Sequence, residues 1–386
     1  MTLKTICSGI LALVMGVSMM LPLAACNKQE SDSSADVPVM TVTEFRGPVS
    51  LVSQCVTTYM SASPDALVTS YLVGSVTDRT DRSKPISIRY DWENNEEVEV
   101  RAAEVQFSLT EDFSDIERTV AFKEGKSSCV VYNLKTGVHY YFRVNATLDG
   151  GQTVSKMGEF DVEQSPRMLY LDGGNNARDI GGWKTESGKV IKQGLLYRGG
   201  EIDGGKNRNH VDFCLTKEGI QQLRDLGIKT DFDLRDPSVA VTKNSVLGED
   251  VKRTFYNAFQ YLDALKPENG ATMKWMFSDL AKPEKYPIYL HCTHGVDRAG
   301  TTSLILEALL GVAKEDLIRD YELSAFYYNY AHVHRNFDTN GGPITKVIEE
   351  LEKFEGETLA DKTANYLKSV GVTDAEIESI RSIFLD

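Results

Sequence analysis

The stretch that most strongly constrains the fold of this chain is residues 287–301. Its first part, Ile288–His291, is a short apolar run typical of a buried strand, and helical periodicity follows over residues 300–310. Between the two lies a polar, glycine-containing loop in which Cys292 and Arg298 bracket five residues. A buried strand that passes through a short loop into a helix is typical of an α/β fold with a mainly parallel sheet.

This loop has the composition of an anion-binding loop. Its backbone N–H groups and the N-terminus of the following helix favour negative charge. Arg298 can donate two parallel hydrogen bonds to phosphate oxygens, and the same positive field favours the thiolate form of Cys292. A thiolate that attacks phosphorus forms a phosphocysteine, which water then hydrolyses. The pattern therefore predicts a phosphate-binding loop with a cysteine nucleophile; the alternative is a structural cysteine on an α/β turn.

The loop in its setting resembles the phosphate loop of cysteine-dependent tyrosine phosphatases. Further stretches are similar to motifs of the bacterial tyrosine/serine protein phosphatase family, which includes secreted, mycobacterial-type enzymes active on phosphotyrosine and phosphoinositides. These stretches are residues 176–182, 195–200, 226–228, 233–235 and 320–324. The resemblance extends from about Leu171 to the C-terminus. It implies the cysteine-dependent phosphatase fold, a mainly parallel sheet flanked by helices, and no cofactor or metal.

Two positions of the loop depart from the family pattern. The family has lysine where this chain has Val296, and the missing charge weakens the case for a polyanionic inositol substrate. The family has threonine where this chain has Ala299, so the hydroxyl that bonds the cysteine sulfur is absent unless Thr301 replaces it. Such a bond is worth about 1.5–3 kcal/mol. We therefore expect turnover to be slower by about one or two orders of magnitude.

The resemblance assigns roles to individual residues. Cys292 is the nucleophile and Arg298 is the phosphate clamp. The leaving oxygen needs a proton from a nearby carboxylic acid. Asp297 is the first candidate, and Asp263, 29 residues before the cysteine, is the second. Asp233, at the carboxyl end of a predicted strand, is the third candidate, and its alternative role is to hold an arginine.

Other residues are expected to surround the substrate. Arg178 and Asp179 are interpreted either as a pair that supports the loop or as part of a structural turn. Arg198 either reaches the anion or pairs with an acid, and His291 either orients the cysteine or is a strand-end histidine. The predicted substrate-binding residues are Thr293, His294, Gly295, Val296, Ala299, Gly300, Asp233 and Arg178.

Residues 39–163 show the pattern of short strands and polar turns. Residues 67–73, 98–101 and 105–109 are β-rich, which predicts an antiparallel sandwich. Residues 134–146 resemble the corner before strand F of fibronectin type III domains, with Tyr140 as the tyrosine whose hydroxyl bonds back to the corner. Such a domain is either a spacer, which we favour, or a binding module.

Residues 164–386 form the predicted catalytic domain. Strands are expected over residues 229–234 and 288–291. Helices are expected over residues 216–226, 300–310, 314–328, 344–354, 358–370 and 374–384. The aromatic residues Phe326, Tyr327, Tyr328 and Tyr330 form either a lid over the site or part of the core.

The N-terminus has the pattern of a bacterial lipoprotein. Residues 1–25 combine a positive start with an apolar run and resemble a signal peptide that ends in a lipobox, so Cys26 is the expected lipidation site. Residues 26–38 are a polar tether. The expected location is the bacterial cell envelope, with membrane contact through this anchor only. In the exported body, Cys55 and Cys129 either form a disulfide or remain buried thiols.

The chain has 42 basic and 56 acidic residues and a net charge of −14, which argues against a nucleic-acid partner. The expected function is hydrolysis of a phosphorylated protein or small phosphomonoester, first of all phosphotyrosine, with dual specificity as a variant. One alternative is an inositol-phosphate, phosphoinositide or phytate phosphatase. Another is a non-catalytic phosphate-binding surface lipoprotein.

Overall fold

The computed structural model describes residues 37–73, 80–93, 98–204, 214–327, 333–337 and 343–385. Residues 1–25, Cys26 and nearly all of the predicted tether lie outside the described residues. The chain divides into two compact units, Met1–Val37 and Pro38–Asp386, and all the described helices and strands belong to the second. Within the described ranges, no helix has the length and apolar character needed to cross a membrane.

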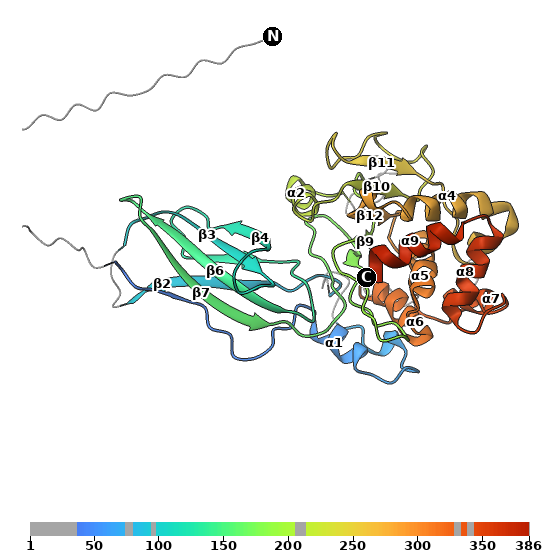
Figure 1. Cartoon of the computed structure of the whole chain (residues 1–386), viewed down its shortest axis with the longest axis horizontal. Coiled ribbons are helices and arrows are strands. Elements are labelled where there is room, and N and C mark those ends of the chain that lie inside the picture. Colours follow the sequence, from blue (N-terminus) through green and yellow to red (C-terminus); the bar gives the residue numbers. More distant parts are fainter. Residues whose placement is uncertain are drawn as a thin grey trace, which may run out of the picture. The chain divides into compact units, whose positions relative to one another are not determined.

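The first half of this unit contains two antiparallel sheets (Figure 1). One has the order β1 (Met40–Val42), β2 (Ile86–Trp92), β5 (Ser128–Val131), and the other has the order β4 (Ile116–Ala121), β3 (Val100–Ser108), β6 (His139–Leu148), β7 (Thr153–Asp161). Burial along β2 and β6 alternates with period two, as expected for strands that face a core on one side. The separate strands predicted at 98–101 and 105–109 are one strand, β3.

Tyr140 makes the contact that the sequence predicts for it. Its buried hydroxyl accepts a hydrogen bond from the backbone N–H of Lys135 at 3.0 Å and donates to Glu117 at 3.1 Å. The side chain therefore fastens the turn before β6 to the strand itself.

The second half is built on a five-stranded sheet. Its order is β11 (Lys252–Phe255), β10 (Thr230–Asp233), β12 (Ile288–His291), β9 (Leu196–Gly199), β8 (Arg178–Asp179). The first four strands are parallel, and β8 is antiparallel to β9. All four residues of the central strand β12 are buried, as its apolar sequence predicts. This part of the chain is therefore a mixed α/β structure with a mainly parallel sheet, as the sequence predicts.

Helices cover both faces of this sheet. Tyr197 and Tyr289 point to the face covered by α2 (Lys217–Asp225), whereas Leu196, Ile288 and Leu290 share a core with the remaining helices. These are α3 (Tyr261–Leu265), α4 (Gly270–Leu280), α5 (Asp297–Leu310), α6 (Lys314–Glu322), α7 (Ile344–Leu351), α8 (Leu359–Ser369) and α9 (Asp374–Leu385). The predicted helices correspond to α2 and to α5–α9, whereas α3 and α4 have no counterpart in the prediction, and α7 ends three residues before its predicted end. Helix α5 begins three residues early, and the helix predicted to Tyr328 ends at Glu322 and continues as a 3₁₀ turn, Leu323–Phe326.

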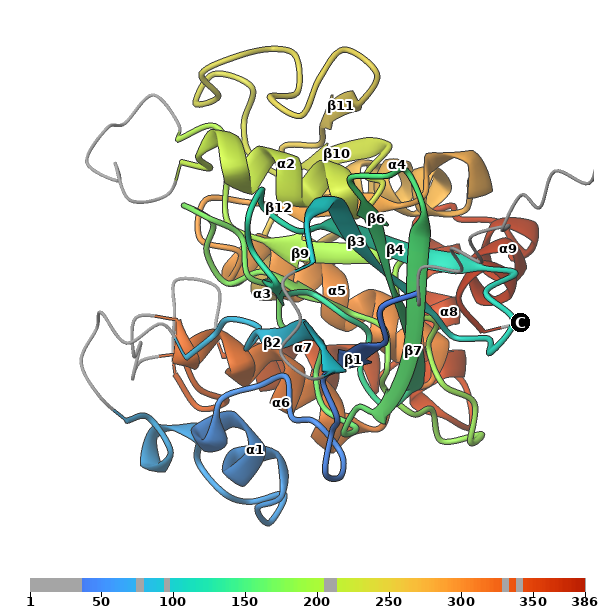
Figure 2. The same cartoon turned by 90° about the vertical axis from the view of Figure 1, so that its left-hand side faces the viewer.

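One segment near the N-terminus packs with the second half of the chain. Helix α1 (Gln54–Met60) lies beside α6 in both views (Figures 1 and 2), and Arg319 of α6 donates to the carbonyl oxygen of Met60 at 2.7 Å. Val52, Val56 and Val68 belong to the core of the α/β sheet. The β-rich pattern at residues 67–73 does not form a strand, because this segment makes a 3₁₀ turn, Val68–Ser70, against that core. No single point of the sequence therefore separates the residues of the sandwich core from those of the α/β core.

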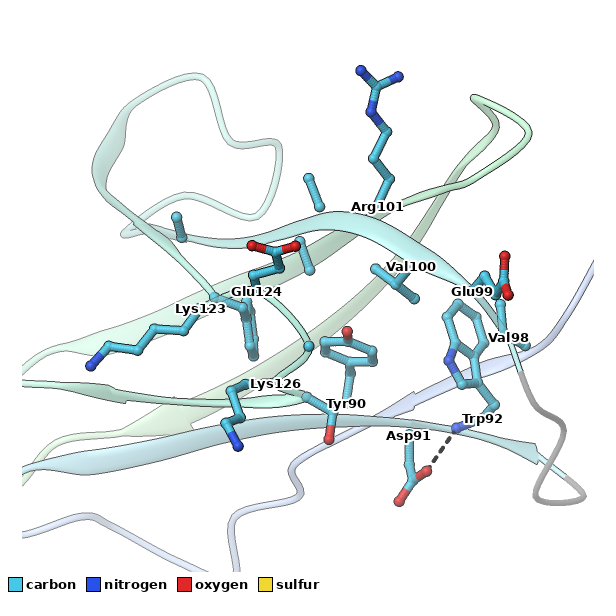
Figure 3. Close-up of a pocket in the computed structure, with 16 residues that line it drawn as sticks. Tyr90, Asp91, Trp92, Val98, Glu99, Val100, Arg101, Lys123, Glu124 and Lys126 are labelled. Carbon is cyan, nitrogen blue, oxygen red and sulfur yellow. Dashed lines mark hydrogen bonds between the residues drawn. The ribbon is translucent and has the colours of Figure 1, made fainter.

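A cleft of about 630 Å³ opens at one end of the sandwich (Figure 3). Tyr90 and Trp92 of β2 and Phe122 line it, with Lys123, Glu124 and other charged residues also along its walls. It contains none of the candidate catalytic residues, so it is separate from the site described next.

Candidate active site

The candidate site forms where β12 ends and α5 begins. Cys292 directly follows β12 and is 2 % exposed. Because α5 begins at Asp297, both Asp297 and Arg298 lie in its first turn. The Arg298 guanidinium donates to the hydroxyl of Thr293 at 3.4 Å, which joins the two ends of the loop. The helix N-terminus with its positive dipole end therefore lies at the loop that carries the cysteine.

The loop is held closely against the end of β9. Gly295 has a φ of +72°, and a Cβ atom built there would lie 2.4 Å from the carbonyl carbon of Gly199. The backbone N–H of Glu201 donates to the Thr293 carbonyl oxygen at 3.0 Å, and the Arg198 guanidinium donates to the Gly295 carbonyl oxygen at 2.8 Å. Only glycine satisfies both the backbone angle and the close approach at residue 295.

Two arginines behind the loop share one aspartate. Arg178 and Arg198 are fully buried, and both donate to Asp320, at 2.9 Å and 2.7 Å. Burial alone raises the pKa of Asp320, but the two guanidiniums outweigh burial and hold it below its ordinary value. Burial and the neighbouring Arg178 lower the pKa of Arg198 to about 10, which leaves Arg198 charged at neutral pH.

This geometry corrects two expectations. Arg178 does not pair with Asp179, because Asp179 is bonded to Arg167 at 2.9 Å. Arg178 is also not placed to bind substrate, since its guanidinium is buried against Asp320, Asn176 and Ser324. Of the alternatives for Arg198, the pairing with an acid is the one observed. Both side chains therefore belong to the framework that supports the loop.

A second buried cluster lies beside His291. The imidazole Nε2 is 2.8 Å from Asp231 and 3.9 Å from Asp233. Asp233 is bonded to Arg235 at 2.8 Å and to Arg253 at 2.5 Å, and it is fully buried. Burial alone raises the pKa of Asp233, but His291 and Arg235 outweigh burial and hold it below its ordinary value. The structure thus contradicts Asp233 as a proton donor or substrate contact and places it in the support of Arg235.

The two remaining acid candidates differ in surroundings. Asp297 accepts a hydrogen bond from the hydroxyl of Tyr261 at 2.5 Å, and that hydroxyl is 2.8 Å from the hydroxyl of Tyr321. Burial and these two neighbours raise the pKa of Tyr261, so it stays a neutral donor. The Asp263 side chain is 40 % exposed and pairs with Lys266 at 2.6 Å. Of the two, Asp297 is the candidate in the first turn of α5, next to Arg298.

The hydroxyl of Thr301 is engaged away from the cysteine. It donates to the carbonyl oxygen of Asp297 at 2.9 Å and accepts from the backbone N–H of Tyr261 at 2.8 Å. Because its only proton is used there, Thr301 does not replace the missing hydroxyl at Ala299, which is fully buried. The expectation of slower turnover therefore stays a prediction.

The other predicted positions are divided between surface and core. Thr293 and His294 are half-buried, and Val296 is buried. A Cβ atom on Gly300 would lie 3.0 Å from the Arg198 guanidinium.

Cys55 and Cys129 are free thiols, so the disulfide is not formed. The lid candidates Tyr328 and Tyr330 lie outside the described residues, whereas Phe326 and Tyr327 are fully buried. Among the described residues, no cluster has the composition of a metal site.

Sequence reasoning missed three residues of the site. Asp320 lies in the stretch 320–324, which resembles a motif of the family, yet no local signal indicates that it is the shared partner of two arginines. Tyr261 lies beside the acid candidate Asp263 but contacts the other candidate. Glu307, farther along α5, is fully buried, and its charge acts on the pKa of Arg198. Each depends on contacts between residues distant in sequence.

A mainly parallel α/β sheet whose central strand ends at a buried cysteine, in a loop closed by an arginine, is the arrangement that the resemblance to cysteine-dependent tyrosine phosphatases implies. Residues 169–386 match the Tyrosine phosphatase family, and this is more than half of the chain. The protein therefore belongs to the tyrosine phosphatase family.

Two proteins of similar sequence are named as tyrosine-protein phosphatases. A protein of Cupriavidus necator named for tyrosine-protein phosphatase activity is 26% identical over 184 residues, which is 41% of this chain and 63% of that protein. A tyrosine-protein phosphatase of Nostoc commune is 22% identical over 213 residues, which is 43% of this chain and 69% of that protein. The chain thus covers less than two thirds of the length of the first relative and slightly more than two thirds of the second.

Proposed function

We propose that this protein hydrolyses phosphomonoesters through a phosphocysteine intermediate and that phosphotyrosine is its main substrate. The observation that carries the proposal is the position of Cys292. It lies at the carboxyl end of the central strand, at the start of a loop that Arg298 closes and that ends at the N-terminus of α5. Ligands of open α/β sheets bind at this edge.

Each step of the proposed reaction has a residue. The thiolate of Cys292 attacks phosphorus, the bond to the leaving oxygen breaks, and Asp297 gives that oxygen its proton. Arg298 and the N–H groups of the loop and the first turn of α5 balance the charge that develops on the phosphoryl oxygens. Water then attacks the phosphocysteine and releases phosphate, with Asp297 now accepting a proton. Thr293, His294 and Val296 border the substrate.

The basic residues of the domain favour phosphotyrosine over inositol polyphosphates. Lys184 and Lys189 lie in a segment in which the backbone N–H of Glu186 donates to the carbonyl oxygen of Gly311, at the C-terminal end of α5. A helix of 14 residues is about 21 Å long, so these lysines lie far from the loop at its other end. Lys206 and Arg208 lie outside the described residues. Val296 also replaces the lysine of the family pattern, so a substrate with a single phosphate group is a better fit than one with several.

The N-terminal part also belongs to the proposal. We propose that residues 39–163 contain a fibronectin type III-like sandwich, supported by its three-stranded and four-stranded sheets and by the Tyr140 contact. We further propose that residues 164–386 are the catalytic domain, onto which α1 packs. A lipid on Cys26 would hold the protein in the bacterial cell envelope. Loss of membrane association in a Cys26→Ala protein expressed in bacteria would test this anchor.

The central experiment compares phosphatase activity on four substrates: a phosphotyrosine peptide, a phosphoserine peptide, a phosphoinositide and phytate. We expect the highest kcat/KM on phosphotyrosine and, in a burst measurement, a slow second step. Cys292→Ser should abolish turnover on all four substrates. Activity that survives this substitution would rule out the cysteine mechanism, and a preference for phytate would favour the inositol alternative.

A further inference from the structure

A short segment outside the family match connects the sandwich to the catalytic loop. We call residues 80–84 the strap. Toward the sandwich, the backbone N–H of Lys84 donates to the carbonyl oxygen of Leu51 at 2.8 Å, and the hydroxyl of Ser83 accepts from the backbone N–H of Asn133 at 3.3 Å. Toward the catalytic core, the hydroxyl of Thr80 donates to the carbonyl oxygen of Phe326 at 3.2 Å. The strap is thus bonded at both ends.

Asp81 is the residue of the strap that reaches the support of the loop. Its side chain is 1 % exposed, and its carboxylate accepts a hydrogen bond from the backbone N–H of Asn176 at 3.0 Å. Asn176 has a φ of +49°, in the left-handed region that is uncommon for residues other than glycine. A bond from the N–H of such a residue to a carboxylate is charge-assisted and holds the strained conformation.

Asn176 passes this constraint to the loop itself. Its side-chain amide nitrogen donates to the carbonyl oxygen of His294, inside the loop, at 3.1 Å. Its amide oxygen accepts from Arg178 at 2.8 Å, and Arg178 is bonded to the same Asp320 as Arg198, which holds the Gly295 carbonyl oxygen. Two adjacent carbonyl groups of the loop are therefore fixed from one buried network, of which Asp81 is the member outside the family match.

We propose that Asp81 is a positioning residue of the active site, supplied by the N-terminal half of the chain. It holds Asn176 in the conformation from which Asn176 fixes the loop at His294. This inference rests on the proposed function for its catalytic readout. In this view the N-terminal half completes the catalytic site in addition to any role as a spacer.

The experiment uses the full chain with three substitutions. Asp81→Ala removes the acceptor, Asp81→Asn keeps an acceptor but removes the charge, and Ser83→Ala is the matched control, because it breaks a buried strap contact that points to the sandwich. Displacement of a catalytic group by about 1 Å can cost about 100-fold in rate. We expect kcat on a phosphotyrosine peptide to fall about 10- to 100-fold for Asp81→Ala and about 3- to 10-fold for Asp81→Asn, with KM changing less. Ser83→Ala should retain kcat within about twofold.

Two further readouts separate this inference from the proposed function. Thermal unfolding shows whether each variant folds, and Asp81→Asn carries the comparison if Asp81→Ala does not fold. The rate at which iodoacetamide alkylates the Cys292 peptide, followed by mass spectrometry, reports the loop without any substrate, and it should change for both Asp81 variants and not for Ser83→Ala. Equal behaviour of the Asp81 and Ser83 variants in this rate would overturn the role of Asp81. An inactive native protein would overturn the proposed function alone.

Discussion

At the scale of single residues, the aspartates of the site differ in whether buried arginines pair with them. Asp320 is shared by Arg178 and Arg198, and Asp233 by Arg235 and Arg253, so both aspartates are held ionised. Among the described residues, the carboxylate of Asp297 has one hydrogen-bond partner, the hydroxyl of Tyr261, and no ion pair. A carboxyl group without a permanent cation partner is suited to carry a proton to a leaving group. The surroundings therefore separate the structural acids from the catalytic candidate.

The choice between the two acid candidates can be tested directly. Asp297→Asn should lower kcat by about 100- to 10,000-fold, the range that general acids contribute, and should flatten the basic limb of the pH–rate profile. Asp263→Asn is the matched control, and because Asp263 is partly exposed and paired with Lys266, kcat should stay within about twofold. A larger loss for Asp263→Asn than for Asp297→Asn would reverse the assignment.

The buried side chain of Glu307 should make the stability of the folded protein depend on pH. It is fully buried, and neither carboxylate oxygen has a hydrogen-bond partner in the described part of the chain. Burial and nearby Asp320 raise the pKa of Glu307 well above its ordinary value, so the folded protein keeps a proton that the unfolded chain releases above about pH 4.3. The native protein therefore loses stability as the pH rises from that value through the raised pKa of the folded state.

Replacing this group with a neutral one should remove the dependence. Glu307→Gln should unfold at a higher temperature than the native protein at pH 8, by about 2–4 °C for each kcal/mol. The difference should shrink toward pH 4. Melting curves from pH 4 to pH 8 measure it, with the exposed Glu268→Gln as the control. A constant difference across this range would show that ionisation of Glu307 does not limit stability.

At the scale of elements, the loop depends on the contact between β9 and the turn before α5. The buried strands β9 and β12 are parallel neighbours, with His291 opposite Gly199. Because both strands end together, the backbone at Gly199 meets the loop at Gly295. The close pairing of two strand ends, and not the loop sequence alone, thus shapes the candidate phosphate site.

A methyl group at Gly295 should disrupt this contact. Gly295→Ala would place a Cβ atom 2.4 Å from the backbone of Gly199 and strain a φ of +72°. We expect kcat to fall by about 100-fold or more. Gly188→Ala is the matched control, because its φ of +85° brings the same kind of strain but no atom lies within 4 Å. It should cost about 1 kcal/mol in stability and leave kcat unchanged. Comparable activities of the two variants would contradict the shaping role of the β9 contact.

At the scale of the whole molecule, the N-terminal half contributes to the core of the catalytic half. Tyr59 of α1 donates to the buried Glu322, which also binds Arg335 at 2.7 Å. Arg335 in turn donates to the carbonyl oxygens of Pro64 and Ala66. A buried carboxylate that loses its partners is strongly destabilising. Composition predicts a domain boundary at residue 163, but residues before it pack into the catalytic half. The stability of the catalytic half therefore depends on residues on both sides of that boundary.

A chain that begins at residue 164 tests this dependence. It retains the whole family match but lacks α1 and the strap, so apolar surface and Glu322 become exposed. We expect it to melt at least about 10 °C below a chain that begins at residue 37, since several kcal/mol of burial are lost. Circular dichroism melting of both proteins measures the difference. Equal melting temperatures would mean that the catalytic half folds independently.

The sequence by itself determined the strand–loop–helix site, most helices of the second half and the corner at Tyr140. Periodicity and motif spacing are local properties, and the chain carries them before it folds. Tertiary structure alone decided that α1 joins the catalytic core, that Asp233 and Arg178 are framework residues, and that Asp81 and Tyr261 reach the site. These depend on which distant residues become neighbours and on how buried charges are compensated, and neither is encoded in a local pattern.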